Sequence, residues 1–226
     1  IQLANVLTDT LGISSMKIIN SILENPDGPV ELESLIHSSL KKKLPELSLA
    51  VDGIFSPEQA IKCTQALDEG IKDSNKDIKA VVSVFVSRLD RLADGDFKLK
   101  GLETSKLGII NATKCYHEIN KFGNSNIRTL FASTGVKGDE LSPSYYVDNL
   151  IYPNSVNTAP LATIEDWVKD GSKVPTAIMS ESDCNKYFDL LKSKGICMET
   201  IYSRLLKDGI DAFKVSFKDL LSKLIH

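Results

Sequence analysis

The stretch that decides the fold is VVSVFVSRLDR, residues 81–91. Its first half consists of β-branched and aromatic residues, which is typical of a strand in a helix-covered parallel sheet. Ser83 interrupts this apolar run, and Arg88 follows it. We therefore predict a strand over residues 79–88, with polar chemistry at its carboxyl end.

Strand-type and helical patterns alternate along most of the chain. Three more strand-type runs lie at residues 47–55, 128–134 and 154–160. Helical patterns lie at residues 56–71, 103–121, 180–193 and 198–207, with a Gly/Asp-containing connection after residue 88 and Gly209 as a predicted C-cap before a last helix. Repeated β-α units predict a parallel sheet covered by helices, and both a (β/α) barrel and a doubly wound sheet satisfy the pattern.

Composition narrows the class of protein. The formal net charge of -3 comes from interspersed acids and bases, which argues against a nucleic-acid partner. No apolar run approaches the ~20 residues that a membrane span needs. The four cysteines show no CxxC spacing, so we expect a reducing, cytoplasmic compartment. A length of 226 residues fits one α/β barrel or two smaller domains.

The carboxyl ends of barrel strands are where working residues gather. Two of the predicted ends offer a cation, Arg88 and Lys137. Lys137 belongs to the turn STGVKGD, residues 133–139, which adds small hydroxyls and a glycine. Such a set suits an anionic, oxygen-rich ligand such as a sugar phosphate.

Three motifs in order, AVVSVFVSRLDR (80–91), LFASTGVK (130–137) and YYVDNLIYPNSVNTAP (145–160), resemble the transaldolases. The resemblance runs from Leu47 to the C-terminus and is specific to the bacterial subgroup with a Ser-Thr-Gly-x-Lys turn after strand seven. It implies a TIM (β/α)8-barrel, read here as one domain over 1–226 with a mostly helical part at 1–46 and strands five to eight with C-terminal helices at 47–226.

The resemblance also implies an activity. Transaldolases transfer a dihydroxyacetone unit between ketose and aldose phosphates in the non-oxidative pentose phosphate pathway, through a Schiff base on a lysine. No metal or organic cofactor is expected. The expected partners are sugar-phosphate substrates, and the expected assembly is a monomer or homodimer.

Residue by residue, the resemblance assigns roles to seven positions. Ser83 matches a catalytic serine that contacts the covalently held three-carbon unit, and Asp9 matches the acid of strand one. The expected substrate-binding positions are Asn25, Phe85, Arg88, Ser133 and Lys137.

Each assignment has a purely structural alternative. Ser83 would bond a local backbone carbonyl, Arg88 would pair with Asp90 at the surface, and Lys137 would be an ordinary solvated charge.

The sequence also departs from the family pattern. Ala50 and Asp52 stand where the family has the Asn and Thr of strand five, and Ala50 cannot hydrogen bond through its side chain. Residues 27–47 show no counterpart of the catalytic Glu or the Schiff-base Lys, and Lys17 has the wrong spacing.

Two explanations of this gap stay open: an internal block is missing from the sequence, or the chain is a natural remnant with an incomplete or rearranged barrel. The leading interpretation is a transaldolase. The alternatives are a non-catalytic, transaldolase-like protein that binds sugar phosphates or acts as an interaction partner, and a different Schiff-base aldolase on the same barrel.

Overall fold

The computed structural model describes residues 54–74, 77–137 and 140–224. Residues Ile54–Leu205 form one compact unit, and the contacts discussed below lie within it. The predictions that concern Asp9, Lys17, Asn25, Ala50 and Asp52 fall outside these ranges and stay predictions.

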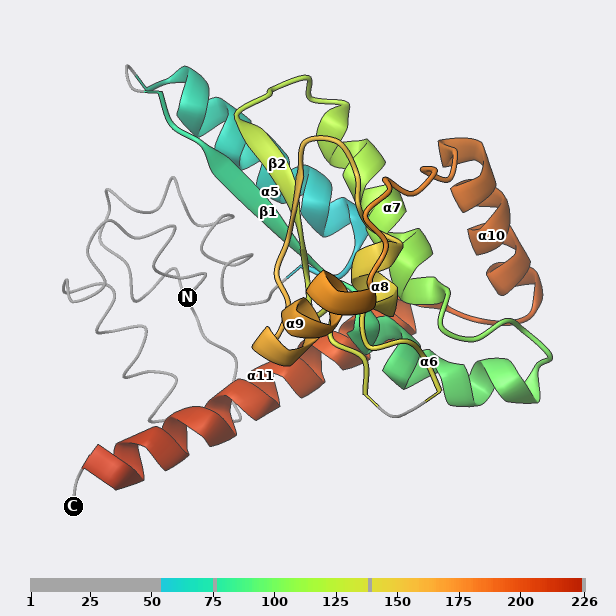
Figure 1. Ribbon diagram of the computed structural model, residues 1–226. Helices are drawn as coiled ribbons and strands as arrows, with labels where there is room; N and C mark the ends of the chain where they lie inside the picture. Colours follow the sequence, from blue (N-terminus) through green and yellow to red (C-terminus); the bar gives the residue numbers. More distant parts are fainter. Residues whose placement is uncertain (1–53, 75–76, 138–139, 225–226) are drawn as a thin grey trace. The chain divides into compact units, whose positions relative to one another are not determined.

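In the described chain, helices separate the strands and three further helices follow the last strand (Figure 1). In order, they are α5 (Pro57–Lys72), β1 (Ala80–Phe85), α6 (Ser87–Leu99), α7 (Leu107–Asn120), β2 (Ile127–Ala132), α8 (Tyr145–Asp148), β3 (Ser155–Asn157), α9 (Leu161–Asp170), α10 (Glu181–Ser193) and α11 (Met198–Leu224). None of these helices combines the length and the apolar character needed to cross a bilayer.

The three strands form one parallel sheet in the order β1-β2-β3. Ser83 pairs with Leu130, and Phe131 pairs with Asn157. Because the strands are parallel, their carboxyl ends lie at one edge, so the segments after β1 and β2 are neighbours. The predicted parallel sheet is confirmed.

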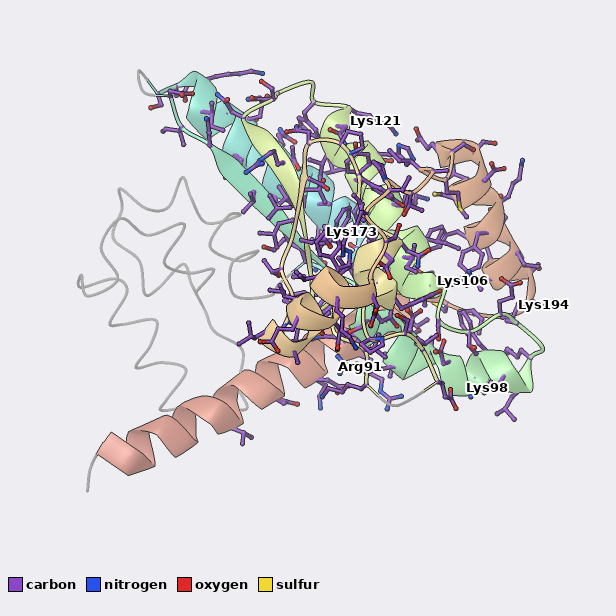
Figure 2. The ribbon with its side chains drawn as sticks, viewed as in Figure 1. Arg91, Lys98, Lys106, Lys121, Lys173 and Lys194 are labelled. Carbon is purple, nitrogen blue, oxygen red and sulfur yellow. The ribbon has the colours of Figure 1, made fainter. Side chains whose placement is uncertain are left out.

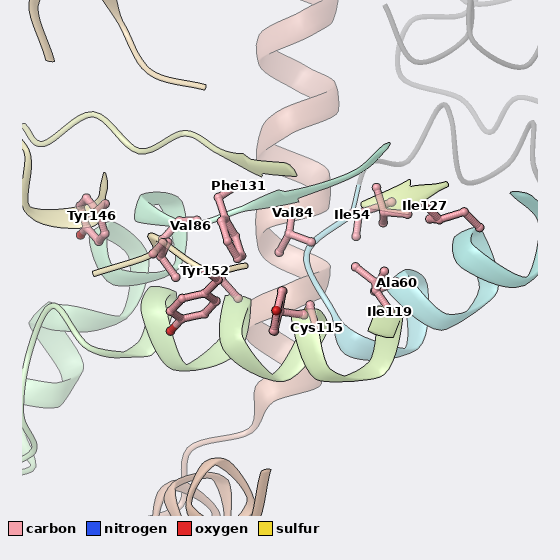
Figure 3. Packing of buried hydrophobic residues seen from close by; sticks show 14 residues of the cluster. Ile54, Ala60, Val84, Val86, Cys115, Ile119, Ile127, Phe131, Tyr146 and Tyr152 are labelled. Atoms are coloured by element: carbon pink, nitrogen blue, oxygen red, sulfur yellow. The ribbon is translucent and has the colours of Figure 1, made fainter. Parts of the chain in front are cut away.

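One face of the sheet carries the main core. Val82 and Val84 of β1 and Phe131 of β2 are fully buried, and they pack with Cys115 of α7. Figure 3 shows Val84 and Phe131 pointing from the strands toward α7. Since side chains alternate along a strand, Ser83 and Phe85 point to the opposite face, where both are only partly buried.

The helix starts follow the expected local chemistry in two places. The Ser56 hydroxyl caps α5 by accepting the backbone N–H of Gln59, and the side-chain oxygen of Gln59 accepts the backbone N–H of Ser56. Ser180 caps α10 in the same position.

The strand predicted over residues 79–88 ends earlier, at Phe85. Val86 already has a helical ψ angle, and α6 begins at Ser87. The N–H groups of Val86 and Ser87 still donate to the carbonyls of Ala132 and Ser133, so sheet pairing continues while the backbone turns. Arg88 therefore lies in the first turn of a helix and not in a strand.

The segment predicted as a Gly/Asp-containing connection is the helix α6. Its buried residues Leu89, Ala93 and Phe97 recur every four positions, which gives one apolar face. Gly95 and Asp96 misled the prediction because both are poor helix formers, but they lie on the exposed side.

Other boundaries also shift. The helix predicted from 103 begins at Leu107, and β2 ends at Ala132 because Ser133 adopts a left-handed φ of 57°. The strand predicted over 154–160 is limited to Ser155–Asn157. Gly209 was expected to end a helix, yet it lies inside the continuous helix α11, where the cost of one glycine is only about 1 kcal/mol.

Candidate functional site

Arg88 stands beside an aromatic pair at the carboxyl end of β1. Its guanidinium carbon lies 4.7 Å from the centroid of the Phe85 ring, in a cation–π contact. Phe85 in turn stacks on Phe55 with ring centroids 5.1 Å apart. Arg88 is partly buried, and among the described residues it makes no hydrogen bond or ion pair. Burial, followed by the charge of Arg91, lowers the pKa of Arg88.

Ser133 ties the turn after β2 to the start of α6. Its carbonyl accepts the N–H of Ser87 at 3.0 Å, and the two serine hydroxyls lie 3.1 Å apart. The left-handed φ of Ser133 allows both contacts. The next residue, Thr134, donates to the carbonyl of Thr158 at 2.6 Å, which links the turn to the segment after β3.

Lys137 lines a small pocket of about 90 Å³ beside the first two turns of α6. Its other walls include Ser87, Asp90, Arg91, Asp94 and Tyr146. Lys137 is exposed, and no hydrogen bond or ion pair to another described residue is present. Lys137 and Arg91 therefore bring two cations to one pocket.

The structure thus brings most of the predicted site residues to one end of the sheet. Ser83, Phe85 and Arg88 occupy the side of β1 away from the main core. Lys137 lies in the pocket with Ser87, which bonds to Ser133 and so connects the two places.

Sequence reasoning missed the role of Asp90. Its side chain is 1% exposed, and it accepts the N–H of Gly108 at 2.8 Å and the hydroxyl of Tyr146 at 2.9 Å. The alternative in which Arg88 pairs with Asp90 is wrong, because Asp90 is buried against α7 and α8. Burial raises the pKa of Asp90 to about 6, although both hydrogen bonds oppose that shift.

Asp90 belongs to a pair of acids that cap α7 from a different helix. Asp94, one turn further along α6, accepts the backbone N–H and the hydroxyl of Ser105. α7 has no side-chain cap of its own and no acid in its first turn. Asp90 and Asp94 are four residues apart and precede a helix that lacks a capping residue. This spacing is a sequence signal that could have predicted their contacts with the start of α7.

Gly108 lets the two helices approach closely. A side chain at this position would place its first carbon 2.5 Å from the carbonyl oxygen of Val86 and 2.8 Å from a carboxylate oxygen of Asp90. This space is available only to glycine.

The described residues offer no substitute for the missing lysine. No lysine whose side chain is described is buried. No group of three or more His, Cys, Asp or Glu within the described ranges could hold a metal ion. The Schiff-base lysine therefore stays unassigned.

A parallel sheet with polar turns gathered at its carboxyl end defines an α/β protein, the class of fold in which ligands bind at that edge. Residues 46–224 match the family described as Transaldolase/Fructose-6-phosphate aldolase. A transaldolase of Helicobacter pylori (strain Shi470) is 41% identical over 169 residues, which is 75% of this chain and 51% of that protein. A transaldolase of Campylobacter jejuni (serotype O:6, strain 81116) is 38% identical over 184 residues, which is 76% of this chain and 54% of that protein.

The chain belongs to the Transaldolase/Fructose-6-phosphate aldolase family, whose fold is the TIM barrel. The predicted family and fold class are confirmed. The chain spans about half the length of the curated relatives it matches.

Proposed function

We propose that the protein is a transaldolase, which transfers a dihydroxyacetone unit between ketose and aldose phosphates through a Schiff base. In this proposal the described residues supply the phosphate-binding part of the site. The observation that carries it is Arg88, a partly buried guanidinium in contact with Phe85 that has no anionic partner among the described residues.

An unpaired, partly buried charge is costly unless a ligand compensates it. The planar fork of an arginine matches a phosphate group, which it binds through two parallel hydrogen bonds. Ser133 and Lys137 lie on the turn next to the first turn of α6, and we assign them to the same phosphate group.

The proposed roles of the remaining residues concern the sugar. The Ser83 hydroxyl would contact the bound three-carbon unit, and Phe85 would line the pocket beside it; the two side chains share a face of β1. Asp9 and Asn25 keep their proposed roles as strand-one acid and substrate contact, outside the described residues.

Borohydride trapping tests the reaction. Intact protein is incubated with fructose 6-phosphate, reduced with borohydride and weighed by mass spectrometry, and transfer to erythrose 4-phosphate is assayed in parallel. A mass increase equal to the reduced three-carbon unit, together with transfer above background, is the expected result. A folded protein that gives neither is not a transaldolase.

The phosphate site is tested separately by binding. Replacing Arg88 with Gln removes a charge-assisted hydrogen-bonding group worth about 1.5–3 kcal/mol, so fructose 6-phosphate should bind roughly 10- to 100-fold more weakly. Arg88→Lys keeps the charge without the fork and should bind with intermediate affinity. Wild-type protein should prefer fructose 6-phosphate to fructose, and equal affinity for both would contradict a phosphate site.

A second candidate function is a non-catalytic protein that binds sugar phosphates or serves as an interaction partner. Two observations favour it: Ala50 replaces an asparagine of the family pattern, and no described lysine is buried. This candidate predicts that fructose 6-phosphate binds through Arg88 and that borohydride traps no adduct. The trapping experiment therefore separates the two functions.

We propose the cytoplasm as the compartment, because the described residues, which include all four cysteines, form no disulfide and two of the cysteines are buried. Cell fractionation tests this location. The proposed assembly is a monomer or homodimer, which light scattering would distinguish.

A further inference from the structure

The ring on which Arg88 lies belongs to a stack of two phenylalanines. The Phe85 and Phe55 rings are nearly parallel, with 27° between their planes, and the N–H of Phe85 donates to the carbonyl of Ile54 at 3.4 Å. Phe55 is almost completely buried, so its close-packed ring has little room to move. Arg91, labelled in Figure 2, lies on the next turn of α6, is exposed, and makes no cation–π contact among the described residues. The position of Arg88 therefore depends on the aromatic stack as well as on the helix.

Two side-chain amides hold the backbone of Phe55. Its N–H donates to the side-chain oxygen of Gln59 at 2.8 Å, at the start of α5. Its carbonyl accepts a side-chain N–H of Asn111, on α7, also at 2.8 Å. Gln59 is a local neighbour, whereas Asn111 is 56 residues away in the sequence. The bond from Asn111 thus connects the aromatic stack to α7.

Asn111 is in turn held by Tyr202 of α11. Asn111 is fully buried, and its side-chain oxygen accepts the Tyr202 hydroxyl at 2.7 Å. Because an amide oxygen only accepts and an amide nitrogen only donates, this bond turns the nitrogen of Asn111 toward the carbonyl of Phe55. All these residues belong to the compact unit Ile54–Leu205. A single line of contacts therefore joins α11 to the ring beneath Arg88.

A second buried pair on α7 has a different kind of partner. Thr113 is 1% exposed, its hydroxyl donates to the carbonyl of Ile109, and it lies 2.8 Å from the hydroxyl of Tyr152. Tyr152 belongs to the main core, so this pair bonds only to its own helix and to that core. Burying an amide such as that of Asn111 costs free energy unless its hydrogen bonds compensate. Those of Asn111 reach the backbone of a ring in the candidate site.

We propose that Asn111 is a positioning residue, which fixes Phe55 and, through the stack with Phe85, holds the guanidinium of Arg88 in place for its ligand. Tyr202 orients Asn111 for this task, and neither of the two touches the ligand. This inference rests on the proposed function, since it concerns how a proposed binding residue is held.

A double-mutant cycle tests this role. Asn111→Leu removes the amide at similar size, and binding of fructose 6-phosphate is measured for it in the wild-type and the Arg88→Gln backgrounds, with unfolding curves to show that every variant is folded. In the wild-type background Asn111→Leu should weaken binding about 10-fold. In the Arg88→Gln background it should weaken binding less than about 2-fold, because Asn111 acts through Arg88. A purely structural residue would not show this dependence on Arg88.

The second buried pair supplies a matched control. Thr113→Val removes a buried hydroxyl with a tyrosine partner from the same helix, and it should change the affinity less than about 2-fold. Adding Tyr202→Phe to Asn111→Leu removes the hydroxyl that has lost its acceptor, so the midpoint of urea unfolding should shift back toward wild type. The affinity should stay low, because Phe55 still lacks its bond.

The outcomes separate this inference from the proposed function. If Arg88→Gln alone weakens binding but Asn111→Leu has no effect, or the same effect in both backgrounds, the inference is wrong and the proposed role of Arg88 stands. The same conclusion follows if Thr113→Val weakens binding as much as Asn111→Leu, or if adding Tyr202→Phe restores the affinity. If Arg88→Gln binds like wild type, or if wild-type protein does not bind fructose 6-phosphate, the proposed role of Arg88 fails and this inference fails with it.

Discussion

Arg88 and Asp90 lie in the same turn of α6 but have opposite surroundings. Asp90 faces α7 and α8, is almost completely buried, and is bonded by Gly108 and Tyr146. Arg88 lies over the Phe85 ring without an ionic partner among the described residues. The internally paired charge holds helices together, whereas the unpaired charge is available to a ligand.

The two faces of the sheet also differ in how deeply their side chains are buried. On the core face, Val84 and Phe131 are fully buried and pack against α7. On the other face, Ser83 and Leu130 pair across the strands and are only partly buried. We therefore expect substitutions on the core face to change stability, and substitutions on the open face to change binding.

The largest expected effect compares two neighbours in β2. Phe131→Ala should lower the free energy of unfolding by about 3–5 kcal/mol, because it removes a buried ring and leaves a cavity. Leu130→Ala, on the open face, should lower it by less than about 2 kcal/mol. Urea unfolding measures both, and equal losses would show that the two faces are not different.

The second prediction concerns pH. Burial raises the pKa of Asp90 from 3.8 to about 6, so between these values the folded protein holds a proton that the unfolded chain releases. Stability contributed by this group is therefore highest below about pH 4, and about 3 kcal/mol of it is lost as the pH rises from about 4 to about 6.

Asp90→Asn removes the titrating carboxyl, so the difference between the variant and wild type reports the pH dependence that Asp90 alone contributes. The variant should gain stability relative to wild type as pH increases from about 4 to 7.5. Measuring urea unfolding of both proteins at several pH values tests this difference. A difference that does not change with pH would mean that the carboxyl of Asp90 is not destabilised by burial.

The sequence predicted the parallel sheet because β1 and β2 are rich in β-branched and aromatic residues and lie between helical patterns. It did not predict α6, since Gly95 and Asp96 disfavour a helix locally and the tertiary packing of Leu89, Ala93 and Phe97 outweighs them.

The sequence predicted some residues of the candidate site and missed others. Arg88, Ser133 and Lys137 belong to local motifs, and they do lie at one end of the sheet. The contacts of Asp90 were missed because they depend on α7 and α8, which are distant in sequence. A motif shows which residues follow a strand, but it does not show which neighbouring groups form hydrogen bonds or ion pairs with each charged side chain.

A smaller effect is expected from a buried hydroxyl on the core face. Thr129 is 1% exposed, and its hydroxyl has no hydrogen-bond partner among the described residues. Thr129→Val keeps the shape and removes the unsatisfied group, so it should stabilise the protein by about 1–2 kcal/mol. Unfolding curves would contradict this expectation if the valine variant were less stable than wild type.

The smallest effect on stability is expected for the hydroxyl on the open face. Ser83→Ala should change the free energy of unfolding by less than about 0.5 kcal/mol, since the described residues give this hydroxyl no hydrogen-bond partner. The same substitution should weaken fructose 6-phosphate about 3- to 10-fold, as expected for one lost hydrogen bond to a ligand, while the affinity for inorganic phosphate stays unchanged. Equal weakening of both ligands would place Ser83 in the phosphate site, and a stability loss without a change in affinity would make Ser83 a structural residue. Together with Thr129→Val, this measurement compares two hydroxyls on opposite faces of one sheet. A loss of affinity without a loss of stability at Ser83 would mean that the face carrying Ser83 binds a ligand.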